Sequence, residues 1–506
     1  MIKDILIVGA GPTGLVLALW LTKQGVSVRI IDKDHGPGET SRAMAVQART
    51  LELYRQLDLA DKTVEAGHKN PSINLWVSGK RKAHVSFGDA GADLTPYPYL
   101  LIYPQDQHEK LLIEKLHSMG VVVERETELI DFESSDKYVS ARLRLPDQSE
   151  AICKVHYLAG CDGARSFVRH KIGAGFAGGT YKQIFYVADV EVIGLEPKNE
   201  THIALDSSDF VAVLSYGNNG ESRLIGTVQD ERAERADALI FDDVEHEAID
   251  KLGLTVKKVN WFSTYRVHHR VAEHFRSKRI FLLGDAAHVH SPAGGQGMNT
   301  GIADAINLSW KLAAVLQGKA PEGLLDSYEI ERQAFARKLV HSTDRIFSFI
   351  SAEGSFANFI RTHIAPIAAN LISRIKSVRK FMFRMISQTN LNYRNSPLSK
   401  GTVGRVQGGD RLPWVATSLV DNYESLRNIH WQIHIYGVAQ PDIRLWCEQN
   451  GIVLHVFEWD PKYKKAGLTQ DAAYLLRPDT YVAFVDAHPT PAALEHYLIT
   501  IGYLSV

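Results

Sequence analysis

DILIVGAGPTGLVLALWLTKQGVSVRIIDK, residues Asp4–Lys33, is the stretch that decides the fold. Its first apolar run predicts a buried strand that leads into Gly9, and the residues after Gly14 predict a helix that ends at Gly25. A second apolar run follows and ends at Asp32. A strand, a glycine-rich turn, a helix and a second strand with an acid at its end form the dinucleotide-binding fingerprint. The sequence therefore predicts a Rossmann-like α/β domain.

The glycines of this turn have separate physical roles. Gly9 allows the tight turn, Gly11 lets the backbone approach a pyrophosphate, and Gly14 lets the helix pack closely on the strand. Asp32 lies about 18 residues beyond Gly14, where an acid accepts a hydrogen bond from a ribose hydroxyl. The alternative is a turn with a purely structural role. The predicted cofactor-binding residues of this segment are Gly9, Gly11, Pro12, Thr13, Gly14, Asp32 and Lys33.

A second glycine-rich segment, RIFLLGDAAHVHSPAGGQGMNTGIADAINLSWKLAAVLQG, spans Arg279–Gly318. Its apolar start is strand-like and ends at Gly284 and Asp285, a loop rich in glycine follows, and a helix with one apolar face completes it. Such a loop lets backbone N–H groups approach a flat anionic ligand at a helix N-terminus. Asp285 is left at the end of a strand, where open α/β sheets bind ligands.

A third motif, YLAGCDGARSFVRHKIG, spans Tyr157–Gly173 and enters a glycine-flanked turn at Asp162 from an apolar strand. Asp162 in this position is compatible with a local Asx-turn. Arg165 and Arg169, at the start of the following helix, favour the handling of an anion instead.

Three further polar side chains lie near these predicted ligand-binding ends. Arg42 and Arg49 follow the ribose-binding acid and could meet a pyrophosphate. For Arg49, a solvated charge at a helix start is an equally good interpretation. Gln105 stands at the start of a predicted helix, Pro104–Gly120, from which it could reach a ligand.

The composition is that of an ordinary globular chain of 506 residues with a formal net charge of -1. This charge gives no electrostatic reason to expect nucleic acid or a membrane, and no apolar run approaches the roughly 18 residues of a membrane span. Cys153, Cys161 and Cys447 form neither a CxxC motif nor a metal-type spacing, which fits a reducing compartment. Because the first strand begins near Ile5, we expect no signal peptide and a cytoplasmic location. No set of His, Cys and acidic residues has metal-ligand spacing, so we expect no metal site.

The remaining segments divide the chain into parts. Strand-like runs rich in aromatic residues between 175 and 275 predict an antiparallel sheet inserted into the nucleotide domain. The basic amphipathic segment Leu371–Ile386 packs on that domain or lies on a membrane surface. The last hundred residues suggest a strand, a helix, a strand, a hairpin at Pro478–Asp479 and a helix, which resembles a thioredoxin-like half without its CxxC. We expect a nucleotide domain at 1–175 and 276–395, a substrate-binding sheet domain at 176–275 and a C-terminal domain at 396–506.

The three motifs, GAGPTG, CDGARSFVR and GDAAHVHSPAGGQGMNTG, occur in this order across most of the chain. Together they resemble the single-component FAD-dependent aromatic hydroxylases, the group A flavoprotein monooxygenases of the para-hydroxybenzoate hydroxylase fold. The similarity is greatest to the branch with a thioredoxin-like C-terminal domain, which includes phenol hydroxylases and hydroxylases of aromatic polyketides. The resemblance implies a Rossmann-like FAD-binding domain with an inserted antiparallel sheet, and a homodimer.

The resemblance also implies roles for particular residues. The fingerprint glycines and Asp32 would hold the adenosine half of FAD, and Arg42 and Gln105 would contact its ADP part. Asp162 would serve both FAD and the reduced nicotinamide, and Asp285 would bind the ribityl chain. The loop that would lie against the isoalloxazine ring, and so take part in catalysis, contains Pro292, Gly295, Gly297, Met298 and Asn299.

The chemistry that the resemblance implies uses NAD(P)H and O2. Reduced flavin would form a C4a-hydroperoxide that must be kept dry, and its electrophilic oxygen would attack an electron-rich ring. Because the sequence holds one Rossmann fingerprint, the nicotinamide would dock transiently. The substrate candidates on the inserted sheet are Tyr216, Arg223 and Tyr265, with His202, Asp206 and Arg266 as further possibilities.

Three alternatives to this interpretation have to be considered. The same fold could inactivate a polycyclic antibiotic, or it could bind flavin without turnover. A flavin-dependent halogenase would carry a Trp-x-Trp-x-Ile-Pro element, which the sequence lacks. The undamaged flavin-contacting motifs argue against a protein that binds flavin without turnover.

Overall fold

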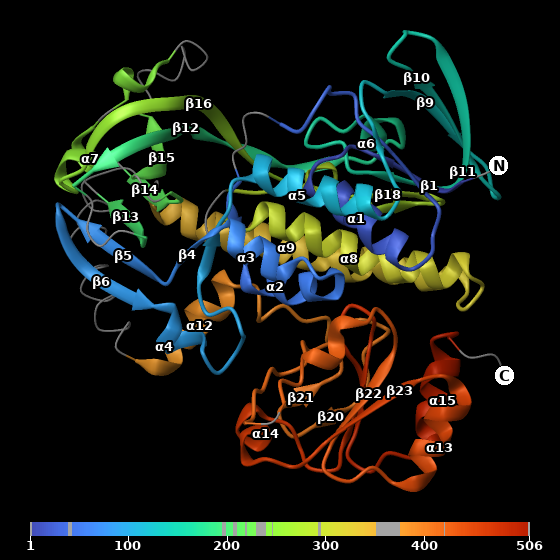
Figure 1. Cartoon of the computed structure of the whole chain (residues 1–506). Helices are drawn as coiled ribbons and strands as arrows, with labels where there is room; N and C mark the ends of the chain where they lie inside the picture. Colours follow the sequence, from blue (N-terminus) through green and yellow to red (C-terminus); the bar gives the residue numbers. More distant parts are fainter. Residues whose placement is uncertain are drawn as a thin grey trace.

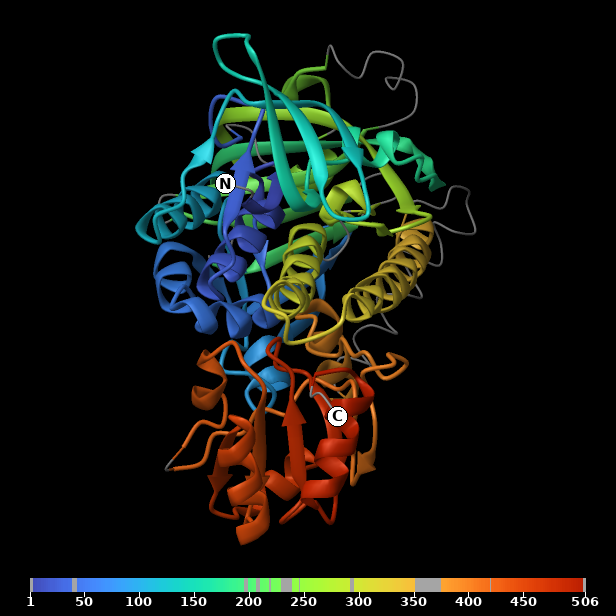
Figure 2. The same ribbon diagram turned by 90° about the vertical axis from the view of Figure 1, so that its right-hand side faces the viewer.

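The structure is a computed structural model that describes residues 3–38, 43–194, 199–205, 210–217, 220–228, 239–244, 246–291, 295–350, 375–418 and 420–503, with the backbone alone for 182 and 342–350. Figure 1 shows two large sheets side by side in the upper part of the molecule and a smaller C-terminal unit below them. The view turned by 90° in Figure 2 shows the same C-terminal unit below the long helices. No helix in the described ranges is long and apolar enough to cross a membrane.

The first sheet is mainly parallel and carries the ends of all three sequence motifs. Strand β1 pairs in parallel with β2 and β11, and β11 pairs in parallel with β18. The carboxyl ends of these strands therefore meet at one edge of the sheet, where such folds bind ligands. Its path of neighbouring strands is β17 (Arg276–Ser277), β18 (Ile280–Leu282), β11 (Glu150–Gly160), β1 (Lys3–Val8), β2 (Val28–Ile31) and β8 (Val123–Glu124). Strand β10 (Val139–Arg144) pairs with β11, and β9 (Glu128–Ser134) pairs with β10.

Two helices lie in close contact beside this sheet. Helix α1 (Pro12–Lys23) follows the first strand, and α8 (Gly297–Leu316) follows the second glycine-rich loop. They approach closely because a Cβ at Gly301 or Gly284 would collide with the Thr13 side chain. Small residues at this contact thus fix the position of the α8 N-terminus. Nearby helices are α2 (Ala48–Tyr54), α3 (Ala60–Ala66), α4 (Phe87–Gly91), α5 (Gln105–Ser118), α6 (Phe167–Lys171) and α9 (Asp326–Ile350).

Within the described residues, the second sheet has eight strands and is the predicted inserted sheet with additions. It takes two strands, β5 and β6, from far earlier in the chain, because β5 pairs in parallel with β13. The continuous range 176–275 therefore does not contain the whole sheet. Its order is β19 (His288–Val289), β16 (Thr255–Ala272), β12 (Phe176–Ile193), β15 (Glu221–Val228), β14 (Phe210–Ser215), β13 (Thr201–Leu205), β5 (Ser72–Val77) and β6 (Lys80–Ser86).

The two faces of this sheet have different neighbours. Alternate residues such as Tyr186 and Leu224 pack on one face with α7 (Glu247–Lys251). Leu214 and Ile225 point to the other face and pack against the core of the first domain. The second face is therefore the one turned toward the first domain. A small third sheet is formed by β3 (Ala45–Val46), β7 (Leu100–Ile102) and β4 (His68–Asn70).

The C-terminal unit has the predicted order of strand, helix, strand, hairpin and helix. Strands β22 and β23 are parallel, and the hairpin of β24 and β25 turns around Pro478–Asp479 as expected. Cys447 is buried in α13. The bounds are β22 (Gln432–Tyr436), α13 (Pro441–Asn450), β23 (Val453–Phe457), α14 (Pro461–Ala466), β24 (Ala473–Leu476), β25 (Val482–Asp486) and α15 (Pro491–Thr500).

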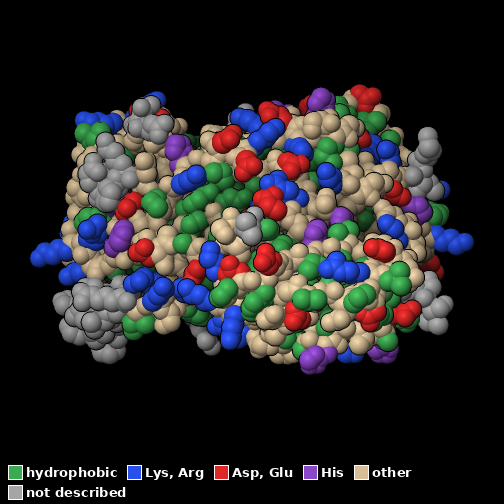
Figure 3. All heavy atoms as spheres, turned by 60° about the horizontal axis from the view of Figure 1, so that its bottom comes forward, with side chains coloured by type: hydrophobic (Ala, Val, Ile, Leu, Met, Phe, Trp, Pro, Cys, Tyr) green, Lys and Arg blue, Asp and Glu red, His purple; other side chains and the backbone are tan. Residues whose placement is uncertain are grey.

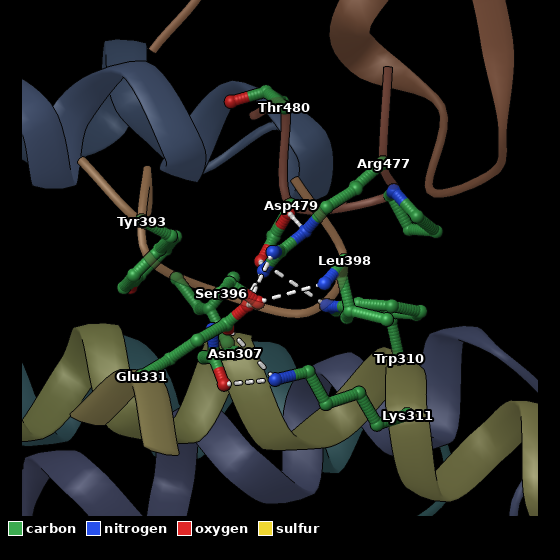
Figure 4. A network of polar contacts seen from close by, with 12 residues as sticks. Asn307, Trp310, Lys311, Glu331, Tyr393, Ser396, Leu398, Arg477, Asp479 and Thr480 are labelled. Atoms are coloured by element: carbon green, nitrogen blue, oxygen red, sulfur yellow. Dashed lines mark hydrogen bonds and ion pairs between the residues drawn. The ribbon is translucent and has the colours of Figure 1, made fainter. Parts of the chain in front are cut away.

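A buried polar network joins this unit to helices α8 and α9 (Figure 4). Glu331 on α9 accepts hydrogen bonds from Arg477, at 2.6 and 3.0 Å, and from Lys311, at 2.8 Å. All three side chains are fully buried. Asp479 binds Arg477 through both oxygens and accepts from the indole N–H of Trp310. The turn of the C-terminal hairpin is thus fixed to the helix that begins at the glycine-rich loop.

Arg49 belongs to the same interface and is neither solvated nor aimed at a ligand. Its guanidinium is 2% exposed and donates to the Thr480 hydroxyl at 2.8 Å and the Asp479 carbonyl at 3.1 Å. It also pairs with Glu52 at 3.2 Å. Both sequence interpretations of this residue, a pyrophosphate contact and an exposed charge, are therefore wrong.

Candidate active site

The fingerprint turn has the geometry that a nucleotide needs. Gly9 has φ +102°, and a Cβ there would overlap the carbonyl oxygen of Cys161. A Cβ at Gly14 would overlap the carbonyl oxygen of Gly9, whereas no atom lies within 4 Å of the Cβ position of Gly11. The turn is therefore closed toward the sheet and open at Gly11, in front of the N-terminus of α1. Pro12 and Thr13 form the first turn of that helix.

Asp32 stands at the end of β2, beside the open turn. Its oxygens accept from the Ala10 N–H at 2.6 Å and the Asp34 N–H at 2.9 Å, and Arg125 lies 3.7 Å away. These contacts hold the carboxylate at the sheet edge, and each oxygen keeps a second lone pair for a ribose hydroxyl. The neighbouring Lys33 is exposed.

Gln105, at the first position of α5, is paired within the protein. Its amide donates at 2.8 Å to Glu109, which also accepts from the Gly38 N–H at 3.3 Å. Burial raises the pKa of Glu109. Sequence reasoning missed this acid, although its position four residues after Gln105 places both on one face of α5. Arg42, the other predicted contact of the ADP part, lies outside the described residues.

Asp162 organises the start of α6. Its two oxygens accept from the Ser166 hydroxyl at 2.5 Å and the Val168 N–H at 3.0 Å. Burial raises its pKa. The buried Arg169 donates to the carbonyl of Ala286 at 3.0 Å and thereby links this motif to the Gly284–Asp285 turn. Its guanidinium is committed to packing and backbone carbonyls, and Arg165 is exposed.

The predicted flavin loop ends in a rigid helix start. The Asn299 side chain accepts from the Gln47 N–H at 2.9 Å and the Thr50 hydroxyl at 2.8 Å, and donates to the Ala45 and Gly295 carbonyls. Because its side chain is bound on all sides, the backbone of this segment is what remains for a ligand. Gly295 has φ +62°, so glycine is favoured there. Gly297 and Met298 are partly exposed in the first turn of α8, and Pro292 lies outside the described residues.

A buried acid that sequence reasoning passed over supports this loop from behind. Asp304 accepts from the Gly284 N–H at 3.0 Å, from Arg332 at 2.5 Å and lies 2.7 Å from the His288 ring nitrogen. Burial alone would raise the pKa of Asp304, but Arg332 and His288 outweigh it and hold that pKa below its usual value. Asp285 itself is exposed at the sheet edge, where it can reach a ligand.

The polar groups and the open helix N-terminus at this edge of the first sheet fit FAD. Gly9, Asp162 and Asp285 follow three neighbouring parallel strands, and the open N-terminus of α1 can receive a pyrophosphate. Among the described residues, His290 Nε2 and Ser291 Oγ are buried without a hydrogen-bond partner beside the loop. Polar atoms of this kind are satisfied by a bound group or water.

Comparison with known proteins decides the family. A family model described as the FAD binding domain matches residues 3–343. The chain is 36% identical over 414 residues to 6-methylpretetramide 4-monooxygenase of Streptomyces rimosus, which covers 79% of this chain and 71% of that protein. The chain belongs to the FAD-dependent aromatic monooxygenases. This finding confirms the family, the cofactor FAD and the enzyme class predicted from the sequence.

Two further similarities extend over nearly the whole monooxygenase. It is 29% identical over 503 residues to rifampicin monooxygenase of Rhodococcus hoagii, covering 96% of this chain and 95% of that protein. The solved ternary complex of aklavinone-11 hydroxylase with FAD and aklavinone superposes with a TM-score of 0.79, at 26% identity and 99% coverage of both chains. The predicted fold class is thereby confirmed.

The substrate candidates of this monooxygenase share one face of the second sheet. On β12, Phe185 lies opposite Tyr265 of β16, and Asp189 lies opposite Arg223 of β15. Because alternate residues of a strand share a face, Phe185 and Asp189 point to the same side of the sheet. Tyr216 packs against the core of the FAD-binding part. This is the face that packs against the FAD-binding part.

The other substrate candidates lie elsewhere. His202 is fully buried on the opposite face, where its ring accepts from the indole N–H of Trp76 at 3.1 Å. Arg266 is exposed, and Asp206 lies outside the described residues. The structure therefore separates His202 from Tyr216 and Tyr265, which sequence alone could not do.

Proposed function

We propose that this monooxygenase uses NAD(P)H and O2 to hydroxylate a polycyclic phenol that has no carboxylate at its reacting ring. When bound, FAD supplies the activation of oxygen. The observation that carries the substrate class is the face formed by Phe185, Tyr265, Tyr216 and the Arg223–Asp189 pair, which is rich in aromatic side chains and packs against the FAD-binding part. The relative named 6-methylpretetramide 4-monooxygenase supports a polycyclic substrate.

Under this proposal the protein binds FAD through the sequence-predicted residues. The N–H groups at Gly11 and Thr13 would meet the pyrophosphate, Asp32 the ribose and Asp285 the ribityl chain. The backbone of Gly295, Gly297, Met298 and Asn299 would lie against the flavin ring, held by the side chain of Asn299. Rigid backbone donors in a site that excludes water orient the ring and favour coupled turnover.

The pairing of Arg223 supports a phenol rather than a benzoate as substrate. Its guanidinium binds the Asp189 carboxylate through two hydrogen bonds of 2.7 Å and is 3% exposed. A bidentate pair of this kind already neutralises the cation. A substrate carboxylate would then meet Asp189 as well as Arg223, which disfavours it.

Tyr216 is expected to act as a hydrogen-bond donor to the substrate. Burial, with a smaller effect of Asp189, raises the pKa of Tyr216 to about 12, so its hydroxyl stays protonated at working pH. Tyr216→Phe should raise KM for the phenol about five- to tenfold, the equivalent of roughly 1–1.4 kcal/mol. The pH profile of kcat between about pH 6 and 10 should not change, because the lost group does not titrate there.

The matched control for this variant is Tyr186→Phe, whose side chain packs on the opposite face of the same sheet. It should leave KM within about twofold of the parent enzyme. Loss of the acidic limb of the kcat profile in the Tyr216 variant, the limb on which an essential base becomes protonated, would instead identify Tyr216 as a base and contradict the donor role.

The overall function is tested by oxidation of NADH and NADPH by the purified holoenzyme with a panel of phenols, benzoates and polycyclic aromatics. Peroxide and hydroxylated product are quantified together. We expect polycyclic phenols to stimulate oxidation with little peroxide, and benzoates to have little effect. Full flavin occupancy without stimulation by any ring would contradict the proposal.

Antibiotic inactivation is the second candidate, because the similarity to rifampicin monooxygenase covers 96% of the chain. The same panel should therefore include rifampicin. Stimulated oxidation and loss of rifampicin, without turnover of simpler phenols, would favour this candidate.

A further inference from the structure

A cavity of about 900 Å³ lies between the FAD-binding part and the C-terminal unit. Its walls come from residues 92–94 after α4, from α12 (Lys376–Ile386), and from the C-terminal segments 405–416 and 462–466. Helix α12 packs on α4, as Phe383 lies against Phe87 and Gly91. None of the described lining residues belongs to the three nucleotide-binding motifs. We call this cavity the basic groove, and it is separate from the FAD site.

The basic groove is lined by more cationic side chains than its acidic side chains can neutralise. Its described lining residues include seven Lys or Arg and two Asp. Both acids are already paired, Asp410 with Arg394 at 2.6 Å and Asp93 with Lys380. Arg411 is paired with Glu52 from outside the groove. On the face shown in Figure 3, Lys and Arg side chains gather in a band toward the lower left.

Four cations of the groove have no carboxylate partner in the described part of the chain. They come from α12 and from two segments of the C-terminal unit. Burial and the like charges of Arg411 and Arg405 lower the pKa of Arg384 by more than the charge of Asp93, which is ion-paired with Lys380, raises it. Their mutual repulsion is a cost that a bound anion would relieve. The four are Arg384, Arg405, Lys462 and Lys465, of which Arg405 and Lys462 donate to backbone carbonyls.

The groove also has an apolar wall suited to a flat ring. Trp414 lines it, and its indole N–H donates to Asp421 at 2.9 Å, which fixes the ring. Pro413 and Val415 flank it. The volume of this cavity is larger than a simple inorganic anion needs and falls within the range of volumes of small-molecule sites. Aromatic side chains of this kind bind nucleobases by stacking.

We infer that the basic groove binds an adenine nucleotide carrying more than one phosphate, with the phosphates at Arg384, Arg405 and Lys465 and the base against Trp414. This chemistry has two sources, the reduced dinucleotide of the proposed function and a free adenine nucleotide. The groove also adjoins the cofactor loop. Thr389 lines it, and the neighbouring Gln388 donates to the Thr300 hydroxyl at 3.1 Å in the first turn of α8.

The test is calorimetric titration of the holoenzyme with 2′,5′-ADP, 5′-ADP and inorganic phosphate, which needs no turnover. Binding of a diphosphate nucleotide should weaken at least tenfold in the double variant Arg384→Gln, Lys465→Gln. The matched control for the change at Lys465 is Lys464→Gln, which removes one positive charge from the same helix, α14, outside the groove and should change Kd less than twofold. Binding should also weaken with salt.

The two possible ligands, the reduced dinucleotide and a free adenine nucleotide, predict different kinetics. If the dinucleotide occupies the groove, KM for NADPH rises in the double variant while kcat is kept. If a free nucleotide does, KM for NADPH stays constant while 5′-ADP binding is lost. No binding by the parent holoenzyme, equal binding by the double variant, or phosphate binding as tightly as the nucleotides would each overturn the inference. A failure of the proposed hydroxylation leaves these titrations unaffected.

Discussion

Gly11→Asp is expected to abolish FAD binding while leaving the fold intact. Gly11 has φ -76°, which aspartate adopts without strain, and no atom lies within 4 Å of its Cβ position. Gly11 is also the N-cap of α1, a position that aspartate favours. The new carboxylate would, however, occupy the approach of the pyrophosphate and repel it. We expect Kd for FAD to rise at least about 100-fold, roughly 2.7 kcal/mol.

The measurement is the flavin content after purification, followed by titration of the apoprotein with FAD. Far-ultraviolet circular dichroism of the apoprotein should match that of the parent. Gly323→Asp is the matched control, because the same substitution there also meets no atom within 4 Å and lies away from the site. A Gly11→Asp protein purified with full flavin would show that the pyrophosphate does not approach this turn.

The second large effect is expected at the interface shown in Figure 4. The carboxylate of Glu331 only accepts hydrogen bonds, and each of its partners is a donor. The partners are Arg477, Lys311, Asn307 and Ser396. In Glu331→Gln the amide nitrogen would face these donors, the buried Lys311 would lose its carboxylate partner, and the buried Arg477 would keep only Asp479. Removing one partner of a buried pair costs about 3–5 kcal/mol, so the free energy of unfolding should fall by about that amount.

Thermal and urea unfolding of the holoenzyme would measure this loss. The matched control is Glu424→Gln, which removes a carboxylate from an ion pair with Arg55 across the same interface. Its side chain is 52% exposed, so we expect a cost of at most about 1 kcal/mol. Equal destabilisation by the two variants would mean that burial of the network contributes nothing to the junction.

The structure of the nucleotide edge could largely be predicted because its determinants are local. A Cβ at Gly14 would meet Gly9 of the same motif, and Asp162 is held by Ser166 and Val168, a few positions along the chain. The backbone at Asn299 was expected to lie against the flavin ring, but nothing in the sequence indicated that its side chain binds Ala45, Gln47 and Thr50. No local pattern indicates partners that lie about 250 positions away.

What the sequence by itself determined is the Rossmann-like start, the order of the motifs, the C-terminal hairpin and, through these, the enzyme family. Only the tertiary structure decided that β5 and β6 complete the second sheet, and that Arg49 and Glu331 bind the C-terminal unit. The physical reason is the separation along the sequence between the residues that determine each feature. Turns and strand ends depend on the backbone conformation of adjacent residues, whereas a charge finds its partner, and a strand its neighbour, only after distant segments have packed.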